Sequence, residues 1–156
     1  MSIAPKLASY LEGAGVTYEV IEHPETPSAS RTAQAAHAPG DRVAKGVLLR
    51  DDQGYLLAVV PSTHQVDLDW VAQLTGRRLE LATEAQIGEV FTDCAVGAVP
   101  PIGPAYGLEM VVDESLAQQP DVYLEAGDHR RLIHVNASDF ARITAGARRG
   151  TFSHHV

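Results

Sequence analysis

The 156-residue sequence has only one cysteine, Cys94, so an internal disulfide is excluded. Long apolar runs are also missing, since none approaches the roughly 18 residues that a membrane-spanning helix needs. The first residues, Met1 to Lys6, lack the basic start and the apolar core of a signal peptide. We therefore expect a cytoplasmic protein without a membrane partner.

Metal-ligand spacing is absent as well, although the chain has seven histidines. His129 and His134 are five residues apart on an expected hairpin and should point to opposite faces, and no Cys or His lies at ligand spacing from Cys94. A serine hydrolase elbow, a Walker loop and a dinucleotide fingerprint are also missing. These absences favour a site without a metal, a cofactor or a strong nucleophile.

Positive charge is scarce, and the net charge of -8 argues against a broad basic surface for long nucleic acid. Three arginine doublets, at residues 77–78, 130–131 and 148–149, could still contact a few phosphates. Lysine is rarer than arginine, and the chain contains only Lys6 and Lys45. A lysine kept within a strand is consistent with a need for a compact donor.

Residues 42–50 are expected to form the strand that carries Lys45. Period-two alternation places Lys45 on one face with Val43, Val47 and Leu49. Removing an unpaired ammonium from water is costly, so this lysine needs a partner or a solvated cleft, unless it simply snorkels at a strand end. The neighbouring Gly46 is typical of a bulge or of the close approach of a ligand or backbone.

The remaining pattern predicts short helices interspersed with hairpins. Expected helices are residues 5–15, 30–38, one capped by Asp67 that ends at Gly76, one opened by the capping box of Thr83 and Gln86, and one capped by Ser138; expected strands include 16–21, 55–60, 78–81, 108–112, 122–125 and 132–135. We expect an α+β fold with one domain over residues 1–146 and a flexible tail over 147–156. Its mixed, mostly antiparallel sheet, or partly closed barrel, would carry packed helices.

Four features are candidates for a common site. They are Lys45, a stiff Pro/Gly loop at residues 93–107 with exposed amides, a His-Pro-hydroxyl loop at 23–30, and a Gly-Asp-His turn at 127–129. Together they would form a small cleft that offers hydrogen-bond donors to a polar ligand. Such a site suits binding, or hydrolysis of a bond that is already activated.

Several short motifs follow one another over about Ile3 to Phe140. They are His23-Pro24, Ala44-Lys45, Val59-Val60-Pro61 before Val66-Asp67-Leu68, Gly97-x-x-x-Pro101 with Gly103, Val112-Asp113 and Glu125-Ala126-Gly127. In this order the sequence resembles the YbaK/EbsC-type family, the free-standing relatives of the editing domain inserted in bacterial prolyl-tRNA synthetases.

The resemblance implies a metal-independent, trans-editing deacylase that hydrolyses the ester of mischarged aminoacyl-tRNA. The expected substrate is a proline tRNA that carries a small wrong amino acid, and the implied partners are the acceptor end of that tRNA and an aminoacyl-tRNA synthetase. The resemblance gives Lys45 as the catalytic residue and places His23, Thr26, Ser28, Ser30, Gly97, Ala98, Val99, Pro101, Gly103, Gly127, Asp128 and His129 in substrate binding. Amides of residues 97–101 are expected to stabilise the oxyanion.

Two departures from the family pattern affect which amino acid is edited. The loop carries an additional Pro100 and an extended segment at residues 104–107, and the turn at 128–131 is unusually charged. The choice among cysteine, alanine, serine and threonine stays open, because a hydrophobic pocket discriminates weakly between small side chains. A non-catalytic module that binds an aminoacyl group, a nucleotide or a synthetase is an alternative, as is a hydrolase of another activated ester.

Overall fold

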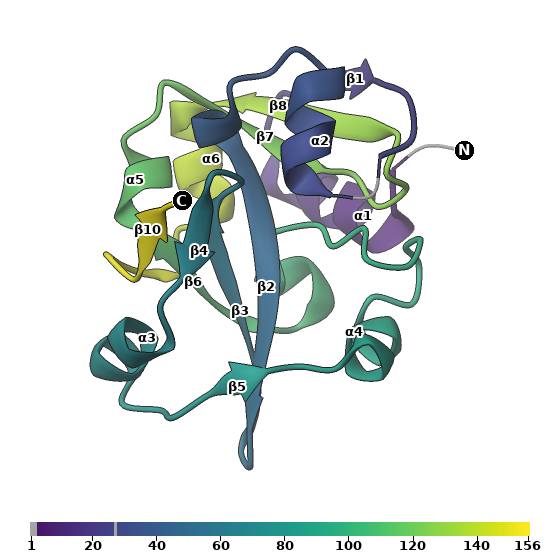
Figure 1. Cartoon of the computed structure of the whole chain (residues 1–156). Helices are drawn as coiled ribbons and strands as arrows, with labels where there is room; N and C mark the ends of the chain where they lie inside the picture. The colour runs from purple at the N-terminus through teal and green to yellow at the C-terminus, as the bar shows by residue number, and fades with distance from the viewer. Residues whose placement is uncertain (1–2, 27) are drawn as a thin grey trace.

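Strands β2 (Val43–Asp51) and β3 (Gly54–Pro61) form a long hairpin at the centre of the protein, as Figure 1 shows. The structure is a computed structural model and describes residues 3–26 and 28–156. The hairpin agrees with the sequence pattern, in which two apolar strands flank the turn at residues 51–54. It provides the frame on which the candidate site is built.

The other described strands extend this hairpin into a mixed sheet in the order β1-β8-β7-β2-β3-β6-β9, and β5 also pairs with β2. Their bounds are β1 Glu19–Glu22, β5 Glu80–Leu81, β6 Glu109–Asp113, β7 Asp121–Glu125, β8 Arg131–Asn136 and β9 Arg148–Gly150. The pairs β2–β7, β3–β6 and β6–β9 are parallel, and the other pairs are antiparallel. Because β1 and β9 remain at the edges, the described sheet does not close into a barrel, and the mixed sheet is the form observed.

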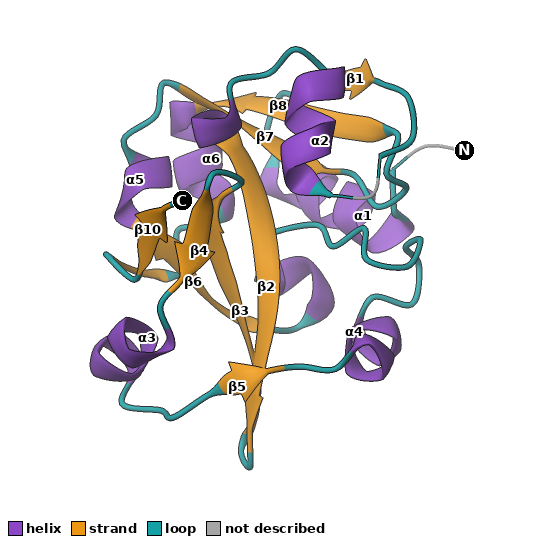
Figure 2. Cartoon of the chain, viewed as in Figure 1, coloured by secondary structure: helices purple, strands orange, loops and turns teal. Residues whose placement is uncertain are grey.

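Helices pack around this sheet in a single domain, as Figure 2 shows. Their bounds are α1 Pro5–Ala14, α2 Ala29–Ala35, α3 Leu68–Thr75, α4 Glu84–Val90, α5 Glu114–Ala117 and α6 Ala137–Ile143, with 3-10 turns η1 Gly40–Arg42 and η2 Gly103–Tyr106. Strands β4 (His64–Val66) and β10 (Ser153–His155) pair separately. No helix in the described ranges is long and apolar enough to cross a membrane.

Two apolar clusters hold the layers together, and successive residues of β2 divide between them. Leu48 belongs to the larger cluster, which contains α1 and α6 residues, whereas Leu49 belongs to a smaller cluster with Val71 of α3 and Phe152. This division follows from the strand period of two. Both faces of β2 are therefore packed against apolar residues, and this packing fixes the position of the strand that carries Lys45.

Local capping signals were reliable guides to two helices. Asp67 caps α3, and Gly76 ends it in the left-handed conformation. Thr83 and Gln86 form the expected capping box at the start of α4. These signals act within a few residues, so they are readable without the tertiary structure.

Other boundaries differ from the sequence-based expectation. Asn136, and not Ser138, caps α6, because the Asn136 side chain accepts a hydrogen bond from the amide of Asp139. Helix α2 begins at Ala29, after the cap Ser28 and one residue before the expected start at Ser30. Strand β1 begins at Glu19 and not at residue 16, and the short α5 and β4 were not expected.

The expectation of a flexible tail at residues 147–156 is wrong for most of that segment. Residues 148–150 and 153–155 form β9 and β10, and Phe152 between them has no exposed surface. The Phe152 amide also donates a 3.0 Å hydrogen bond to Asp113 Oδ1. The segment is ordered because an aromatic side chain fills the smaller apolar cluster.

Candidate functional site

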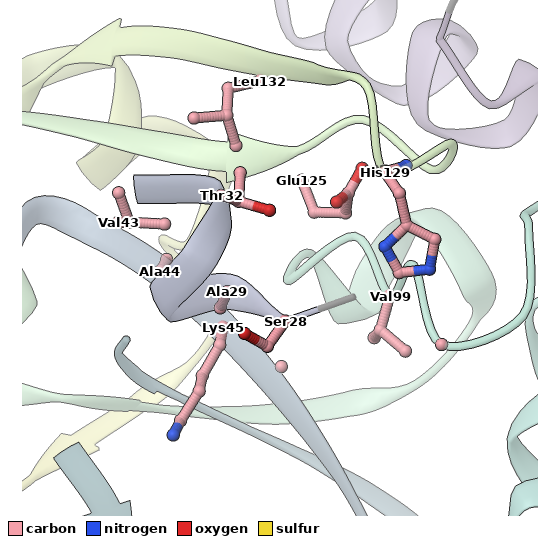
Figure 3. Close-up of a pocket in the computed structure, with 12 residues that line it drawn as sticks. Ser28, Ala29, Thr32, Val43, Ala44, Lys45, Val99, Glu125, His129 and Leu132 are labelled. Atoms are coloured by element: carbon pink, nitrogen blue, oxygen red, sulfur yellow. Dashed lines mark hydrogen bonds between the residues drawn. The ribbon is translucent and has the colours of Figure 1, made fainter. Parts of the chain in front are cut away.

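A cavity of about 70 Å³ lies where α2, β2, the loop at residues 97–99 and the β7–β8 hairpin meet, as Figure 3 shows. It is lined by Ser28, Ala29, Thr32, Val43, Ala44, Lys45, Gly46, Gly97, Val99, Glu125, His129 and Leu132. Space of this size holds a few waters or a small side chain. The fold thus brings Lys45, Ser28, Gly97, Val99 and His129 together around one cavity.

Lys45 lies near the start of β2, opposite Val60 of β3. The side chain is half-buried, and burial lowers the pKa of its ammonium. None of the described residues accepts a hydrogen bond or forms an ion pair with it, and Figure 3 shows its nitrogen directed away from Glu125 and His129. An unpaired, partly desolvated ammonium is poised to receive an anion or a polar ligand group.

Gly46 lets the Pro/Gly loop approach β2 closely. A Cβ atom at Gly46 would lie 3.1 Å from Val99 Cγ1 and 3.4 Å from Pro101 Cα. This is the close backbone approach that a glycine within a strand often marks. The loop therefore forms one wall of the cavity beside Lys45.

Within residues 97–101, only Gly97, Ala98 and Val99 have backbone N–H groups, because residues 100 and 101 are prolines. The Ala98 amide is already used, since it donates a 3.0 Å hydrogen bond to Ala95 O. The amides of Gly97 and Val99 have no acceptor among the described residues. Residues 97–101 therefore offer two free backbone donors, fewer than expected for this loop. Both donors belong to residues that line the cavity.

The Gly-Asp-His turn is tied to this loop from the other side. His129, with φ of 60°, donates from Nε2 to Val96 O at 2.6 Å, and Ala95 N donates to Gly127 O at 2.8 Å. The turn itself is held by the Glu125 carboxylate, whose Oε2 accepts hydrogen bonds from the amides of Gly127, Asp128 and His129. His129 therefore positions the segment that leads into Gly97.

Thr26, Ser30 and His23, on the other hand, do not line the cavity. Thr26 shares a hydrogen bond with Thr32 Oγ1, and Ser30 Oγ donates to Ser62 O at 3.3 Å. His23 is buried with Nδ1 2.7 Å from Pro24 O, and its Nε2 has no partner in the described part of the chain. His23 and Thr26 lie in the segment that leads into α2, and Ser30 lies in the first turn of α2.

The other expected site residues that do not line the cavity support its walls. Ala98 is buried, and the backbone of Pro101 packs closely against Gly46. A Cβ at Gly103 would lie 2.9 Å from Leu108 O, so this glycine serves backbone packing. Asp128 accepts hydrogen bonds from the amides of Arg130 and Arg131, at 2.9 and 3.0 Å.

Sequence reasoning missed Glu125, Thr32 and the apolar lining residues Val43, Ala44 and Leu132. A signal for Glu125 existed, because a carboxylate directly before a glycine turn can accept the turn amides. Thr32 and Leu132 carried no such local signal, since they meet only when α2 packs beside the β7–β8 hairpin.

Cys94 is not an activated nucleophile, because burial raises the pKa of its thiol to about 12. Within residues 3–26 and 28–156, no group of three or more His, Cys, Asp or Glu side chains is arranged to hold a metal ion. The polar groups that the cavity offers are therefore an ammonium, a carboxylate, hydroxyls, an imidazole and two amides.

Comparisons with known proteins identify the family to which the chain belongs. A family model of the aminoacyl-tRNA editing domain matches residues 23–143. The chain is 23% identical to the proline–tRNA ligase of Bacillus cereus (strain G9842) over 120 residues, which cover 75% of this chain. The match covers only 21% of that ligase, so the chain corresponds to about a fifth of its length.

Solved structures share the fold over nearly the whole chain. A candidate trans-editing enzyme for prolyl tRNA synthetase matches with a TM-score of 0.83 and 28% identity, covering 97% of this chain and 96% of the other. A scaffold protein from computational epitope grafting matches with a TM-score of 0.82 and 25% identity, covering 98% and 97%. Since the family model also matches most of the chain, this protein belongs to the aminoacyl-tRNA editing domain family, as its resemblance to the YbaK/EbsC-type proteins predicted.

Proposed function

We propose that this protein is a trans-acting deacylase that hydrolyses the ester of mischarged aminoacyl-tRNA. The observation that carries the proposal is the cavity that is lined by Lys45, Gly97 and Val99, where the amides of Gly97 and Val99 have no acceptor among the described residues. The editing-domain family and the likeness to a candidate trans-editing enzyme for prolyl tRNA synthetase support it. The substrate would be a proline tRNA that carries a small wrong amino acid, in the cytoplasm.

An aminoacyl ester is already reactive, so the protein needs chiefly to position it and to stabilise charge. Water adds to the ester carbonyl, and the amides of Gly97 and Val99 hydrogen-bond to the oxygen that becomes negative. The bond from the carbonyl carbon to the ribose oxygen then breaks, and the ribose oxygen takes up a proton. Amino acid and tRNA with a free 3′ end are released.

In this mechanism Lys45 anchors a phosphate or another polar group of the substrate and forms no covalent bond. A ribose hydroxyl of the terminal adenosine helps to hold the attacking water. No metal takes part in the proposed mechanism, because backbone amides supply the charge stabilisation. Displacing water from the small cavity would strengthen these interactions.

The size of the cavity bears on the amino acid that is removed. A volume of about 70 Å³ suits a small side chain, and its apolar walls include Val43, Val99 and Leu132. Such walls discriminate by size and only weakly between similar side chains. We therefore propose alanine, cysteine or serine as candidate substrates, attached to proline tRNA.

The alternative is a binding module that holds an aminoacyl group, or a synthetase, without turnover. The unpaired charge of Lys45 also suits this role, since binding requires only complementary groups. Release of the amino acid distinguishes the two functions.

The decisive assay measures release of amino acid from alanyl-, cysteinyl- and seryl-tRNA for proline, with the wild-type protein and Lys45→Ala. We expect hydrolysis of one or two of these esters and a loss of activity in Lys45→Ala. Wild-type activity without loss in the variant would refute the role of Lys45. Binding of the charged tRNA without any release would favour the binding module.

A further inference from the structure

Among the described residues, Glu125 is the one acidic side chain that lines the cavity, and its two carboxylate oxygens have different surroundings. Oε2 accepts the amides of Gly127, Asp128 and His129 at 2.8, 3.3 and 3.3 Å. Oε1 has no hydrogen-bond partner among the described residues. Within those residues, the only buried side-chain polar atom without a partner is His23 Nε2, so Glu125 Oε1 is accessible to solvent.

No Lys, Arg or His side chain forms an ion pair with Glu125 in the described part of the protein. Lys45 lines the same cavity without pairing with it. In Figure 3 the Glu125 carboxylate lies beside His129, while the Lys45 nitrogen points away from both. The cavity thus presents two opposite charges at separate places, and each lacks a counter-charge from the protein. A partly enclosed carboxylate of this kind favours binding a cation.

We propose that Glu125 Oε1 binds the α-ammonium group of the aminoacyl ester and thereby selects esters with a free amino group. The proposal rests on the proposed deacylase function and specifies its substrate class. An α-ammonium is attached to the carbon next to the ester carbonyl, so binding one group positions the other.

The contacts around the cavity are compatible with an ammonium site at Glu125 beside an oxyanion site at Gly97 and Val99. The His129 amide bonds to Glu125, and His129 Nε2 lies 3.8 Å from the position of a Cβ on Gly97. Gly97 supplies one of the two free amides, so the carboxylate and the oxyanion donor are joined through one histidine. The ammonium would bind Glu125 while the carbonyl oxygen faces Gly97 and Val99, and Lys45 remains available for a phosphate.

The test compares an alanyl ester with a lactyl ester on the same tRNA, because lactate replaces the ammonium with a hydroxyl of similar size. Glu125→Gln keeps an oxygen for the turn amides and removes the charge. Glu12→Gln, on the exposed surface of α1, removes the same charge away from the cavity. Each rate is divided by the spontaneous hydrolysis rate of its ester.

We expect the wild-type protein and Glu12→Gln to prefer the alanyl ester by roughly 10- to 100-fold in kcat/KM, the range for a hydrogen bond to a charged group. Glu125→Gln should lose most of this preference because only its alanyl rate falls. An equal fall for both esters would mean that Glu125 merely holds the turn, and this would overturn the proposal. No preference in the wild-type protein would overturn it as well.

A binding measurement separates failure of this proposal from failure of the deacylase function. Adenosine analogues that carry alanyl or lactyl groups through a stable 3′-amide cannot be hydrolysed, and their affinities are measured by calorimetry. If the wild-type protein hydrolyses none of the alanyl, cysteinyl, seryl and lactyl esters, the deacylase function fails. A preference for the alanyl amide that Glu125→Gln abolishes would still support ammonium binding. Absence of that preference, or of any binding, would refute it.

Discussion

The outer side of the β1–β8–β7 sheet and the cavity differ in how they place charge. On the sheet, His134 lies between Glu19 and Asp121, at 2.7 and 2.6 Å, and its ring stacks on Tyr123 with 4.3 Å between centroids. Asp121 also forms an ion pair with Arg42, with 3.0 Å between Asp121 Oδ1 and Arg42 Nη1. Every charged group of this cluster therefore has a partner, and the cluster connects three strands and η1.

In the cavity, Lys45 and Glu125 have no oppositely charged partner among the described residues. Partly buried charges without partners reduce stability, whereas a ligand that supplies the missing charge recovers the loss. The comparison suggests that paired charges join the strands and that unpaired charges await the substrate. Substitutions in the two regions should accordingly affect different properties.

The largest effect is expected at the turn that supports the cavity. Gly127 has φ of 116°, and a Cβ there would lie 2.9 Å from Ala4 Cβ and 3.2 Å from Cys94 Sγ. Strain and overpacking should make Gly127→Ala less stable by about 2–4 kcal/mol, measured by chemical denaturation. Gly146→Ala is the matched control, because no atom lies within 4 Å of its added Cβ. Equal stability of the two variants would show that this turn does not depend on its glycine.

A second experiment exchanges an unpaired and a paired cation for methionine. Lys45→Met should lower deacylation by roughly 10- to 100-fold and leave the free energy of unfolding unchanged or higher, because no protein partner is lost. Arg77→Met should lower the denaturation midpoint and spare activity, since Arg77 bonds to Asp51 at 2.7 and 2.9 Å and lies 3.3 Å from Glu109. If the two variants changed by similar amounts in activity, or in stability, the proposed distinction between unpaired and paired charges would be wrong.

Asp51 offers an acid-range measurement of the same ion pair. The Arg77 guanidinium and backbone amides hold the pKa of Asp51 at about 2, below its ordinary value of 3.8, although partial desolvation opposes them. A lowered folded-state pKa means that the stabilisation is present above pH 3.8 and is lost as the pH falls toward about 2. Asp51→Asn should remove the part of the pH dependence of the unfolding free energy that comes from this carboxylate. Unfolding curves measured between about pH 5 and about pH 2, a range that covers both pKa values, would detect the change.

The smallest effect is expected at His134. Partial burial opposes its protonation, but the hydrogen bonds to Glu19 and Asp121 outweigh burial and raise its pKa above 6.5. The stabilisation from protonation is therefore fully present below pH 6.5 and is lost as the pH rises through the folded-state pKa. His134→Gln should be more destabilising in acid than in alkaline solution, by on the order of 0.5 kcal/mol for a partly exposed pair. A pH-independent difference would contradict this assignment.

Signals confined to a few neighbouring residues predicted their elements correctly. The Asp67 cap, the Thr83–Gln86 capping box and the β2–β3 hairpin are examples, because their hydrogen bonds form within short segments. The cap of α6 was assigned wrongly, since both Asn136 and Ser138 are suitable caps and packing decides between them. The order of the tail depends on Phe152, which is buried in a cluster that β2, β3, α3 and β6 form together.

The amino-acid sequence by itself determined the family, the α+β fold, the hairpin that carries Lys45 and the small residues that let a loop approach Gly46. These properties rest on side-chain periodicity, local caps and ordered short motifs. Only the tertiary structure decided which candidates share the cavity, left two amides of the loop free and brought Glu125 into the site. Those outcomes depend on contacts between residues that are far apart in the chain, as when His129 reaches Val96, and no local pattern encodes such distances.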